Sequence, residues 1–268
     1  MIFKFQIKKR SRFLLALFFS VISSVSFSQN WQWLTSAGGD KSDKGIDIDL
    51  DRLGNLYVSG YYNNSSSGNV MFSSIVAPVD FGKDSFLARM DSSGNWVWMQ
   101  PGQGGWDERA LGMCVDRVFD AVYVTGTCWY NTNFGSCPTP TYPGGQDNIF
   151  VGKFDLNGNC QWLIEAGSGS DDHGYDLVTD KAGNVYLTGF ISNDSWTPSD
   201  SACFGNLTAT VTPGDSLGFI TKISPAGIFQ WVKTFPGIDG ERDNRITIDS
   251  DANIYITGSF YGTQAYNT

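Results

Sequence analysis

A motif of ten or eleven residues occurs four times along this chain of 268 residues. Each copy begins with Asp and ends with Gly, and the copies cover residues 51–60, 116–126, 180–189 and 249–258. Their central tyrosines are Tyr57, Tyr123, Tyr186 and Tyr255. A fixed period of about 65 residues is typical of a repeat architecture, in which one small structural unit is stacked several times. The repeat therefore constrains the fold before any single segment does.

Two further positions keep the same period. A Trp precedes each motif at intervals of 65, 64 and 69 residues: Trp33, Trp98, Trp162 and Trp231. An acidic residue keeps the same intervals: Asp43, Glu108, Asp172 and Glu241. A third block, DSFLARMDSSGN in its first copy, follows the motif three times, and the chain ends at Thr268 before a fourth. The sequence is therefore interpreted as an unfinished array.

Each period divides into four strand patterns, A to D, expected in the first copy at residues 45–50, 55–62, 85–90 and 96–100. Apolar and polar residues alternate within them, and Gly, Asn and Asp separate them, as in antiparallel strands joined by tight turns. Repeated four-stranded units without helical segments predict an all-β fold, a β-propeller. We expect about three and a half blades, with repeats near residues 45–100, 110–166, 174–235 and 243–268.

Residues 31–37 match strand D, although no strands A to C precede them. In a closed propeller a detached first strand commonly completes the last blade, so we expect this closing strand to join a blade beyond residue 268. An open array exposes strand edges. Self-association through these edges is therefore also expected.

The pattern G-x-x-x-x-x-D-x-x-G-N-x-Y-x-[ST]-G, then D-x-F-x-x-[KR]-x-D-x-x-G-N and Trp, resembles the SBBP-type β-propeller repeat of exported bacterial proteins. The resemblance covers about residues 31–268 and implies a ring of roughly six to eight blades but no single activity. The turn around Phe119 and the residue Ser224 depart from it. The spacing Gly94-x-x-x-Trp98, repeated twice, is similar to the tryptophan-docking element of quinoprotein propellers. It predicts a Trp wedged between blades, with no cofactor implied.

Residues 1–28 have the pattern of a cleaved signal peptide. Five basic residues precede an apolar run from Phe13 to Phe19, and the small residues Ser26 and Ser28 follow. The run is shorter than the ~20 residues that span a bilayer. We therefore predict a secreted or cell-surface protein with 13 basic and 27 acidic residues after cleavage, a net charge of −14. Such a charge argues against a nucleic-acid partner.

In a propeller blade the D–A and B–C connections share one face, and the other face has only tight turns. The first, here called the loop face, carries the acidic segments and three long loops near residues 62–83, 127–146 and 191–214. Variable loops on a rigid scaffold commonly carry binding sites. We expect a protein or glycan ligand to bind there, with these aromatic candidates: Tyr61, Tyr62, Trp129, Tyr130 and Trp196. Recurring Phe72, Phe134 and Phe204 predict a small hairpin within each long loop.

The recurring acidic residues have two interpretations. A ring of carboxylates around the central channel would bind a cation or a cationic ligand, whereas isolated carboxylates would accept backbone N–H bonds and hold the D–A loops. The turns Asp155–Asn159 and Asp249–Asn253 are interpreted as hairpin chemistry, because the closing Glu of a calcium loop is missing. His173 is the single histidine and has no accompanying nucleophile motif. No catalytic residue, metal or cofactor is assigned.

The function expected from these features is a non-catalytic binding scaffold. Two alternatives stay open: a carbohydrate-active enzyme with its site at the channel mouth, and a purely structural surface module. A sialidase-like repeat fits poorly, because the turns follow D-x-x-G-x-x-x-W and not S-x-D-x-G-x-x-W. The recurring cations Arg89, Lys153 and Lys222 predict pairing between blades with Asp or backbone carbonyls.

The five cysteines indicate disulfide chemistry in an exported protein. Cys128 and Cys137 lie nine residues apart in one loop and form the candidate pair. Cys114 and Cys160 fall in strand patterns, where buried thiols are expected. Cys203 lies in a variable loop, and the odd count leaves at least one thiol free.

Overall fold

The computed structural model describes residues 2–5, 31–63, 69–79, 82–129, 132–137, 147–193, 201–236 and 244–259. These residues form antiparallel strands and turns, with no helix among them. Within these ranges there is accordingly no apolar helix of the length that crosses a bilayer. The predicted all-β class is confirmed.

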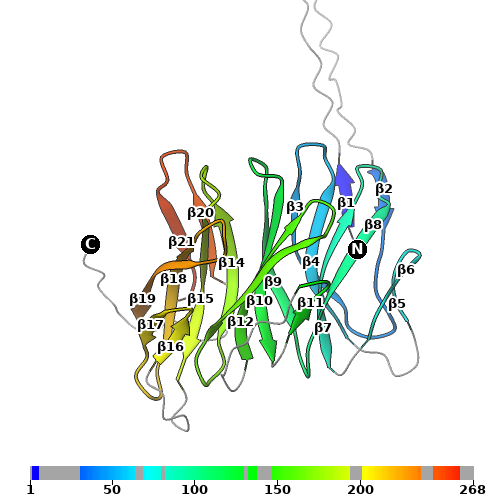
Figure 1. Cartoon of the computed structure of the whole chain (residues 1–268). Coiled ribbons are helices and arrows are strands. Elements are labelled where there is room, and N and C mark those ends of the chain that lie inside the picture. Colours follow the sequence, from blue (N-terminus) through cyan, green and yellow to red (C-terminus); the bar gives the residue numbers. More distant parts are fainter. Residues whose placement is uncertain are drawn as a thin grey trace, which may run out of the picture.

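Three four-stranded antiparallel blades stand side by side (Figure 1). Blade 1 contains β3 (Lys44–Leu50), β4 (Leu56–Asn63), β7 (Lys83–Met90) and β8 (Trp96–Gln103). Blade 2 contains β9 (Arg109–Asp116), β10 (Ala121–Trp129), β12 (Asp147–Asp155) and β13 (Cys160–Gly167). Blade 3 contains β14 (His173–Thr179), β15 (Val185–Ser192), β18 (Ser216–Ile223) and β19 (Phe229–Pro236). Strands β20 (Arg245–Ile248) and β21 (Ile254–Thr257) form a further pair beside blade 3.

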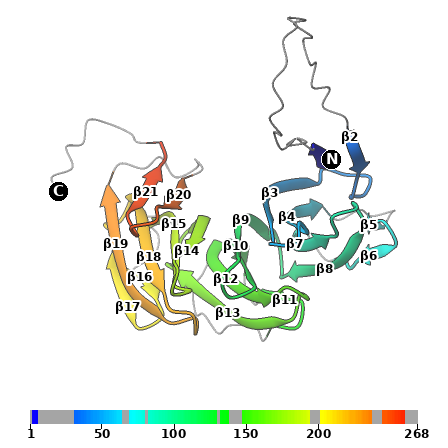
Figure 2. The ribbon, with the colours of Figure 1, turned by 90° about the horizontal axis from the view of Figure 1, so that it is seen from above.

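The first strand of each blade contacts the first strand of the next, from β3 through β9 and β14 to β20. Seen from above, the blades fan out from this inner row of strands (Figure 2). Carboxylates close the row: Asp47 accepts a hydrogen bond from the Met113 amide at 3.0 Å, and Asp176 accepts one from the Ile246 amide at 3.0 Å. The first strand of a blade has no strand partner on its inner side, so some of its N–H groups lack a ladder bond. Carboxylates of the preceding blade accept the hydrogen bonds of these N–H groups.

The predicted hairpins are present in the first and third long loops, whereas the described part of the second forms a single short strand. In blades 2 and 3 these segments attach to the blade before their own. The short strand β11 (Asn133–Phe134) in the long loop of blade 2 pairs with β8 of blade 1. The hairpin β16 (Ser201–Phe204) and β17 (Leu207–Thr210) of blade 3 extends blade 2 through β13. Phe72, Phe134 and Phe204 are all buried. The long loops therefore strap neighbouring blades together.

Blade 1 follows the same plan with a different neighbour. Its hairpin, β5 (Val70–Phe72) with β6 (Ile75–Ala77), meets the segment after β2 (Trp31–Thr35) through a bridge between Gly38 and Met71. Strand β2 thus occupies the place of a preceding strand D, as the sequence pattern predicts. Strand β1 (Ile2–Phe5) pairs antiparallel with β2. It lies in the segment assigned to the signal peptide, whose cleavage stays a prediction.

The periodic Trp residues bridge adjacent blades. The indole nitrogens of Trp33, Trp98 and Trp162 donate to the carbonyls of Ser92, Leu156 and Pro225 at 3.2, 3.2 and 3.0 Å. Each acceptor lies in the C–D turn of the following blade. A glycine with positive φ follows each acceptor two residues on and lies against the indole: Gly94, Gly158 and Gly227. The predicted wedging of Trp between blades is confirmed.

A cation lies between Tyr and Trp on three adjacent strands of each blade. In blade 1 the row is Tyr57, Arg89 and Trp98, with the guanidinium 5.9 Å from the Tyr57 ring centre. Arg89 donates to the Leu156 carbonyl at 3.4 Å, and Lys153 of blade 2 donates to the Pro225 carbonyl at 3.3 Å. These bonds cross to the next blade, as predicted for the recurring cations.

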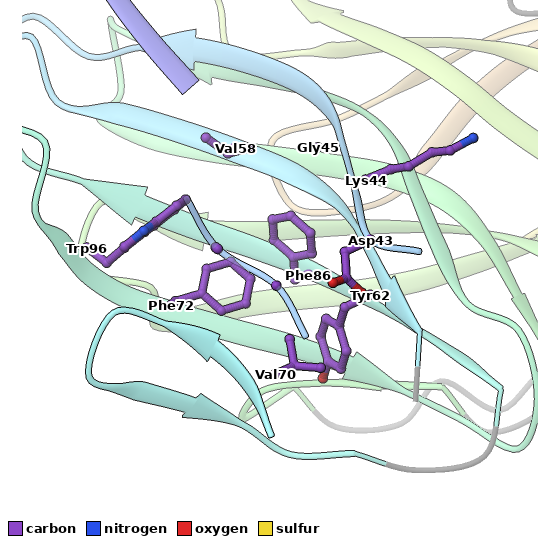
Figure 3. Close-up of a pocket in the computed structure, with 11 residues that line it drawn as sticks. Asp43, Lys44, Gly45, Val58, Tyr62, Val70, Phe72, Phe86 and Trp96 are labelled. Atoms are coloured by element: carbon purple, nitrogen blue, oxygen red, sulfur yellow. The ribbon is translucent and has the colours of Figure 1, made fainter. Parts of the chain in front are cut away.

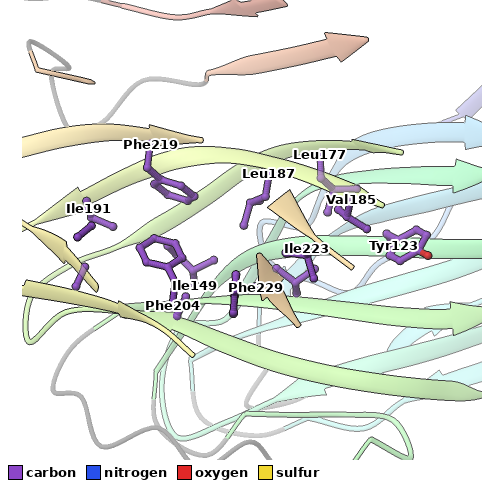
Figure 4. Close-up of a cluster of buried hydrophobic side chains, with 14 of the residues drawn as sticks. Tyr123, Ile149, Leu177, Val185, Leu187, Ile191, Phe204, Phe219, Ile223 and Phe229 are labelled. Atoms are coloured by element: carbon purple, nitrogen blue, oxygen red, sulfur yellow. The ribbon is translucent and has the colours of Figure 1, made fainter. Parts of the chain in front are cut away.

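The apolar cores lie between blades. Figure 4 shows the cluster between blades 2 and 3, where Tyr123 and Ile149 meet Leu187, Phe204 and Phe219. All five side chains are fully buried. Burying such aromatic and aliphatic side chains is the main source of stability in a stacked array.

The equivalent face of blade 1, which turns away from blade 2, leaves a cavity of about 70 Å³ (Figure 3). Val58, Tyr62, Phe72 and Trp96 line it. At the next interface, Tyr57 and Leu87 of blade 1 are fully buried in the core shared with blade 2.

The disulfide differs from the prediction. Cys137 bonds to Cys160, at a sequence separation of 23, and Cys128 is a buried free thiol. The predicted Cys128–Cys137 pair and the thiol expected at Cys160 are therefore wrong. Phe134 packs on Phe150 and Phe154 of β12. This packing places Cys137, three residues after Phe134, close to Cys160 at the start of β13.

Candidate functional site

The structure places two of the recurring carboxylates beneath the loop face as loop anchors. Asp43 accepts hydrogen bonds from the amides of Gly39 at 2.6 Å and Asn63 at 3.0 Å. Asp172 accepts bonds from the amides of Ser168 and, at 2.9 Å, Ser192. Each carboxylate thus joins a D–A loop to the end of strand B, which matches the loop-holding interpretation. Glu241 lies outside the described residues.

Burial changes the chemistry of two of these acids. Glu108 and Asp172 have no exposed surface. Burial raises the pKa of Glu108 to about 8, with a further increase from Asp84, while the amides of Trp106 and Trp129 oppose the change. Burial also raises the pKa of Asp172 to about 8, outweighing its two amide donors. Both carboxyl groups lie inside the protein, so neither contributes to an exposed ring at the channel.

Two aromatic candidates are buried, which corrects the expectation that they are exposed. Tyr62 is fully buried, donates to the Pro78 carbonyl at 2.7 Å and stacks on Phe86. Tyr61 is 9% exposed, and the amines of Lys44 and Lys83 lie 5.9 Å from its ring centre. Strand β4 is an interior strand whose two faces are both covered, so its aromatic residues pack inward.

The remaining aromatic candidates have separate outcomes. Trp129, the last residue of β10, is partly buried. Tyr130 and Trp196 lie outside the described residues.

Trp106 is a large exposed aromatic on the loop face that the sequence analysis did not single out. Its side chain is 65% exposed, and its ring centre lies 6.2 Å from that of Trp129 at an interplanar angle of 49°. A comparison of the repeats would have found it. Trp106 lies two residues before the recurring acidic residue of its blade. At the same position blades 1 and 3 have Lys41 and Ser170, which are not aromatic.

Charged side chains fix the loop that carries Trp106. One oxygen of Asp107 accepts bonds from the Lys83 amine and, at 3.1 Å, from Arg109; its other oxygen accepts the Lys83 amide at 3.0 Å. Burial alone would raise the pKa of Asp107. The hydrogen bonds from Lys83 and Arg109 outweigh this effect and hold the pKa below its usual value. Trp106, Trp129, Lys83, Asp107 and Arg109 are called the Trp106 patch below.

Backbone contacts hold the same loop. The Glu108 amide donates to the Lys83 carbonyl at 2.7 Å. At Gly82, with φ +85°, a Cβ atom would lie 2.0 Å from the Trp106 carbonyl oxygen, so a side chain is excluded there. These contacts fix the backbone of the patch at the edge of blade 2.

The acidic turns are closed by their own hydrogen bonds. Asp155 accepts the amides of Asn157 and Asn159 at 2.8 and 2.9 Å and the Asn159 side-chain amide at 2.8 Å. Asp249 makes the equivalent bonds with Asp251 and Asn253. This geometry is that of Asx-type turns. In the described part of the chain, no three His, Cys, Asp or Glu residues gather as a metal site.

His173 begins the inner strand of blade 3. Its Nε2 lies 3.6 Å from Asp147, and its ring packs 4.8 Å from that of Phe190. The imidazole is thus part of the packing between blades 2 and 3.

Comparison with known proteins adds one relative. No protein-family model matches the chain. A protein described as an uncharacterized WD repeat-containing protein of Acanthamoeba polyphaga mimivirus is 31% identical over 129 residues, which is 45% of this chain. The match spans 9% of that protein's length. Together with the stacked antiparallel sheets, the similarity supports a repeat protein of the β-propeller type; the SBBP resemblance stays a prediction.

Proposed function

We propose that this protein is a non-catalytic β-propeller scaffold that binds a protein or glycan through its loop face. We further propose that residues 1–28 direct it to the cell surface or out of the cell. The observation that carries the binding proposal is the Trp106 patch, where an indole 65% exposed belongs to a loop fixed by Lys83, Asp107 and Arg109. Trp and Arg are among the residue types enriched at binding hot spots.

The enzymatic alternative, a carbohydrate-active site at the channel mouth, has less support. An acid catalyst must reach its substrate within hydrogen-bonding distance. Glu108 and Asp172 have raised pKa values but no exposed surface, and both oxygens of Asp43 accept backbone bonds. The geometry therefore favours binding without turnover.

The test compares variants of the protein on an array of saccharides and a library of synthetic peptides. Trp106→Ala is expected to weaken binding of the recognised ligand at least tenfold. Leu53→Ala is the matched control, because Leu53 is 80% exposed in an A–B turn on the opposite face. Circular dichroism and the unfolding midpoint establish that both variants are folded.

Three other results would change the proposal. Turnover of polysaccharide would support the enzymatic alternative, and no binding to either library would support a structural module. Equal loss in both variants would place binding elsewhere than on the loop face. Export is tested separately, by fractionating cells that produce the protein with and without residues 1–28.

A further inference from the structure

We infer that the Trp106 patch binds an acidic pyranose, a sugar unit that carries a carboxylate, within a polysaccharide. This inference rests on the proposed function and specifies the ligand class of the same face.

The patch departs from the repeat at two positions that meet in space. Trp129 lies three residues after the motif glycine, where blades 1 and 3 carry Asn63 and Ser192. Trp106 likewise occupies the position at which blades 1 and 3 have Lys41 and Ser170. Blades 1 and 3 form the same loop anchors without either indole, so the architecture does not require them. Two aromatic replacements in one blade that contact each other indicate a site particular to this blade.

The size of the patch favours a small unit. A buried aromatic side chain contributes about 150–250 Å², so two indoles supply at most ~500 Å². A stable protein partner covers about 800 Å² on each side. A pyranose ring fits the smaller area, because one of its faces presents C–H groups to an indole while its hydroxyls reach the polar groups at the edge.

The charges on the patch favour an acidic sugar. Side chains of Lys83 and Arg109 are 26% and 34% exposed, and Lys44 beside them is exposed. Asp107, whose side chain is 35% exposed, binds two of these three cations, Lys83 and Arg109.

The test is calorimetric titration with oligogalacturonate, oligoglucuronate and oligomannuronate, each paired with its carboxyl-reduced neutral form. We expect at least one acidic oligosaccharide to bind at least tenfold more tightly than its neutral form. Trp106→Ala should abolish this binding and Trp106→Phe should retain part of it. Arg109→Gln should reduce the preference for the acidic form, and Leu53→Ala should change nothing.

The outcomes separate this inference from the proposed function. Tight binding of a peptide that depends on Trp106, without saccharide binding, would overturn the sugar assignment and retain the loop-face site. Equal affinity for acidic and neutral forms would overturn the role of the cations. Failure of every saccharide and every peptide would overturn both proposals.

Discussion

The indole nitrogen of Trp98 donates a hydrogen bond to the carbonyl of Leu156, across the boundary between blades 1 and 2, at 3.2 Å. The same carbonyl accepts a bond from Arg89 at 3.4 Å, and the Tyr57 hydroxyl donates to it at 3.3 Å. The Tyr, Arg and Trp side chains of this row in blade 1 therefore all donate to one turn carbonyl of blade 2. Since Trp162 and Lys153 converge on Pro225 in the same way, the turn positions one blade on the next.

The first prediction concerns the glycine beneath this indole. In Gly158→Ala the new Cβ atom would lie 3.0 Å from the Trp98 ring at φ +84°, so we expect a loss of about 2 kcal/mol or more. Gly214→Ala is the control, because Gly214 has the same φ with no heavy atom within 4 Å of the added Cβ. It should lose only about 1 kcal/mol. Urea unfolding measures both, and equal losses would contradict a role for the Trp contact.

The second prediction concerns the strand β11, which straps the long loop of blade 2 to blade 1. Phe134 is fully buried against Phe150 and Phe154, so Phe134→Ala should cost about 3–5 kcal/mol through the cavity that it leaves. Phe119→Ala, at a side chain 53% exposed, should cost about 1 kcal/mol or less. Thermal unfolding of the two variants checks the difference. A small effect at Phe134 would show that the strap adds little to stability.

The third prediction concerns the disulfide. A peptide map under non-reducing conditions should contain Cys137 joined to Cys160 and no Cys128–Cys137 peptide. Cys160→Ser should lower the free energy of unfolding by about 3 kcal/mol, because it opens a loop of this length. Cys203→Ser removes a free thiol and should have a smaller effect. Loss of the crosslink on mutating Cys128 would contradict the pairing.

The fourth prediction is a pH dependence of stability. The folded protein keeps Glu108 protonated up to about pH 8, whereas the unfolded chain releases this proton near pH 4.5. The group therefore stabilises the fold most at low pH, and its contribution is lost as the pH rises from about 4.5 to 8.

Glu108→Gln tests this dependence, because the amide keeps the shape and cannot ionise. Unfolding free energies at pH 5 and pH 8 should differ less in the variant, by on the order of 2 kcal/mol. A residual slope is expected from Asp172, whose pKa is also raised to about 8. An unchanged slope would show that Glu108 is ionised in the folded state.

Most of the fold could be predicted from periodicity, while parts of the site could not. The strand patterns locate blade 1 to within two or three residues, and Phe204 correctly marks a hairpin. Tyr61 and Tyr62 are expected as exposed aromatic residues at the start of a long loop, and the structure buries both. A residue at the end of an interior strand is covered or exposed according to neighbouring loops, and their paths are not encoded in local alternation.

The sequence alone determined the repeated four-stranded unit, the Trp at each blade boundary and the face that carries the long loops. These features follow from local pattern: alternation defines strands, turn residues end them, and a fixed period stacks them. The tertiary structure decided which blade each hairpin joins, that Cys137 pairs with Cys160, and that Trp106 meets Trp129. Each of these depends on the distance between segments of different strands or blades, and only the packing of the whole array sets that distance.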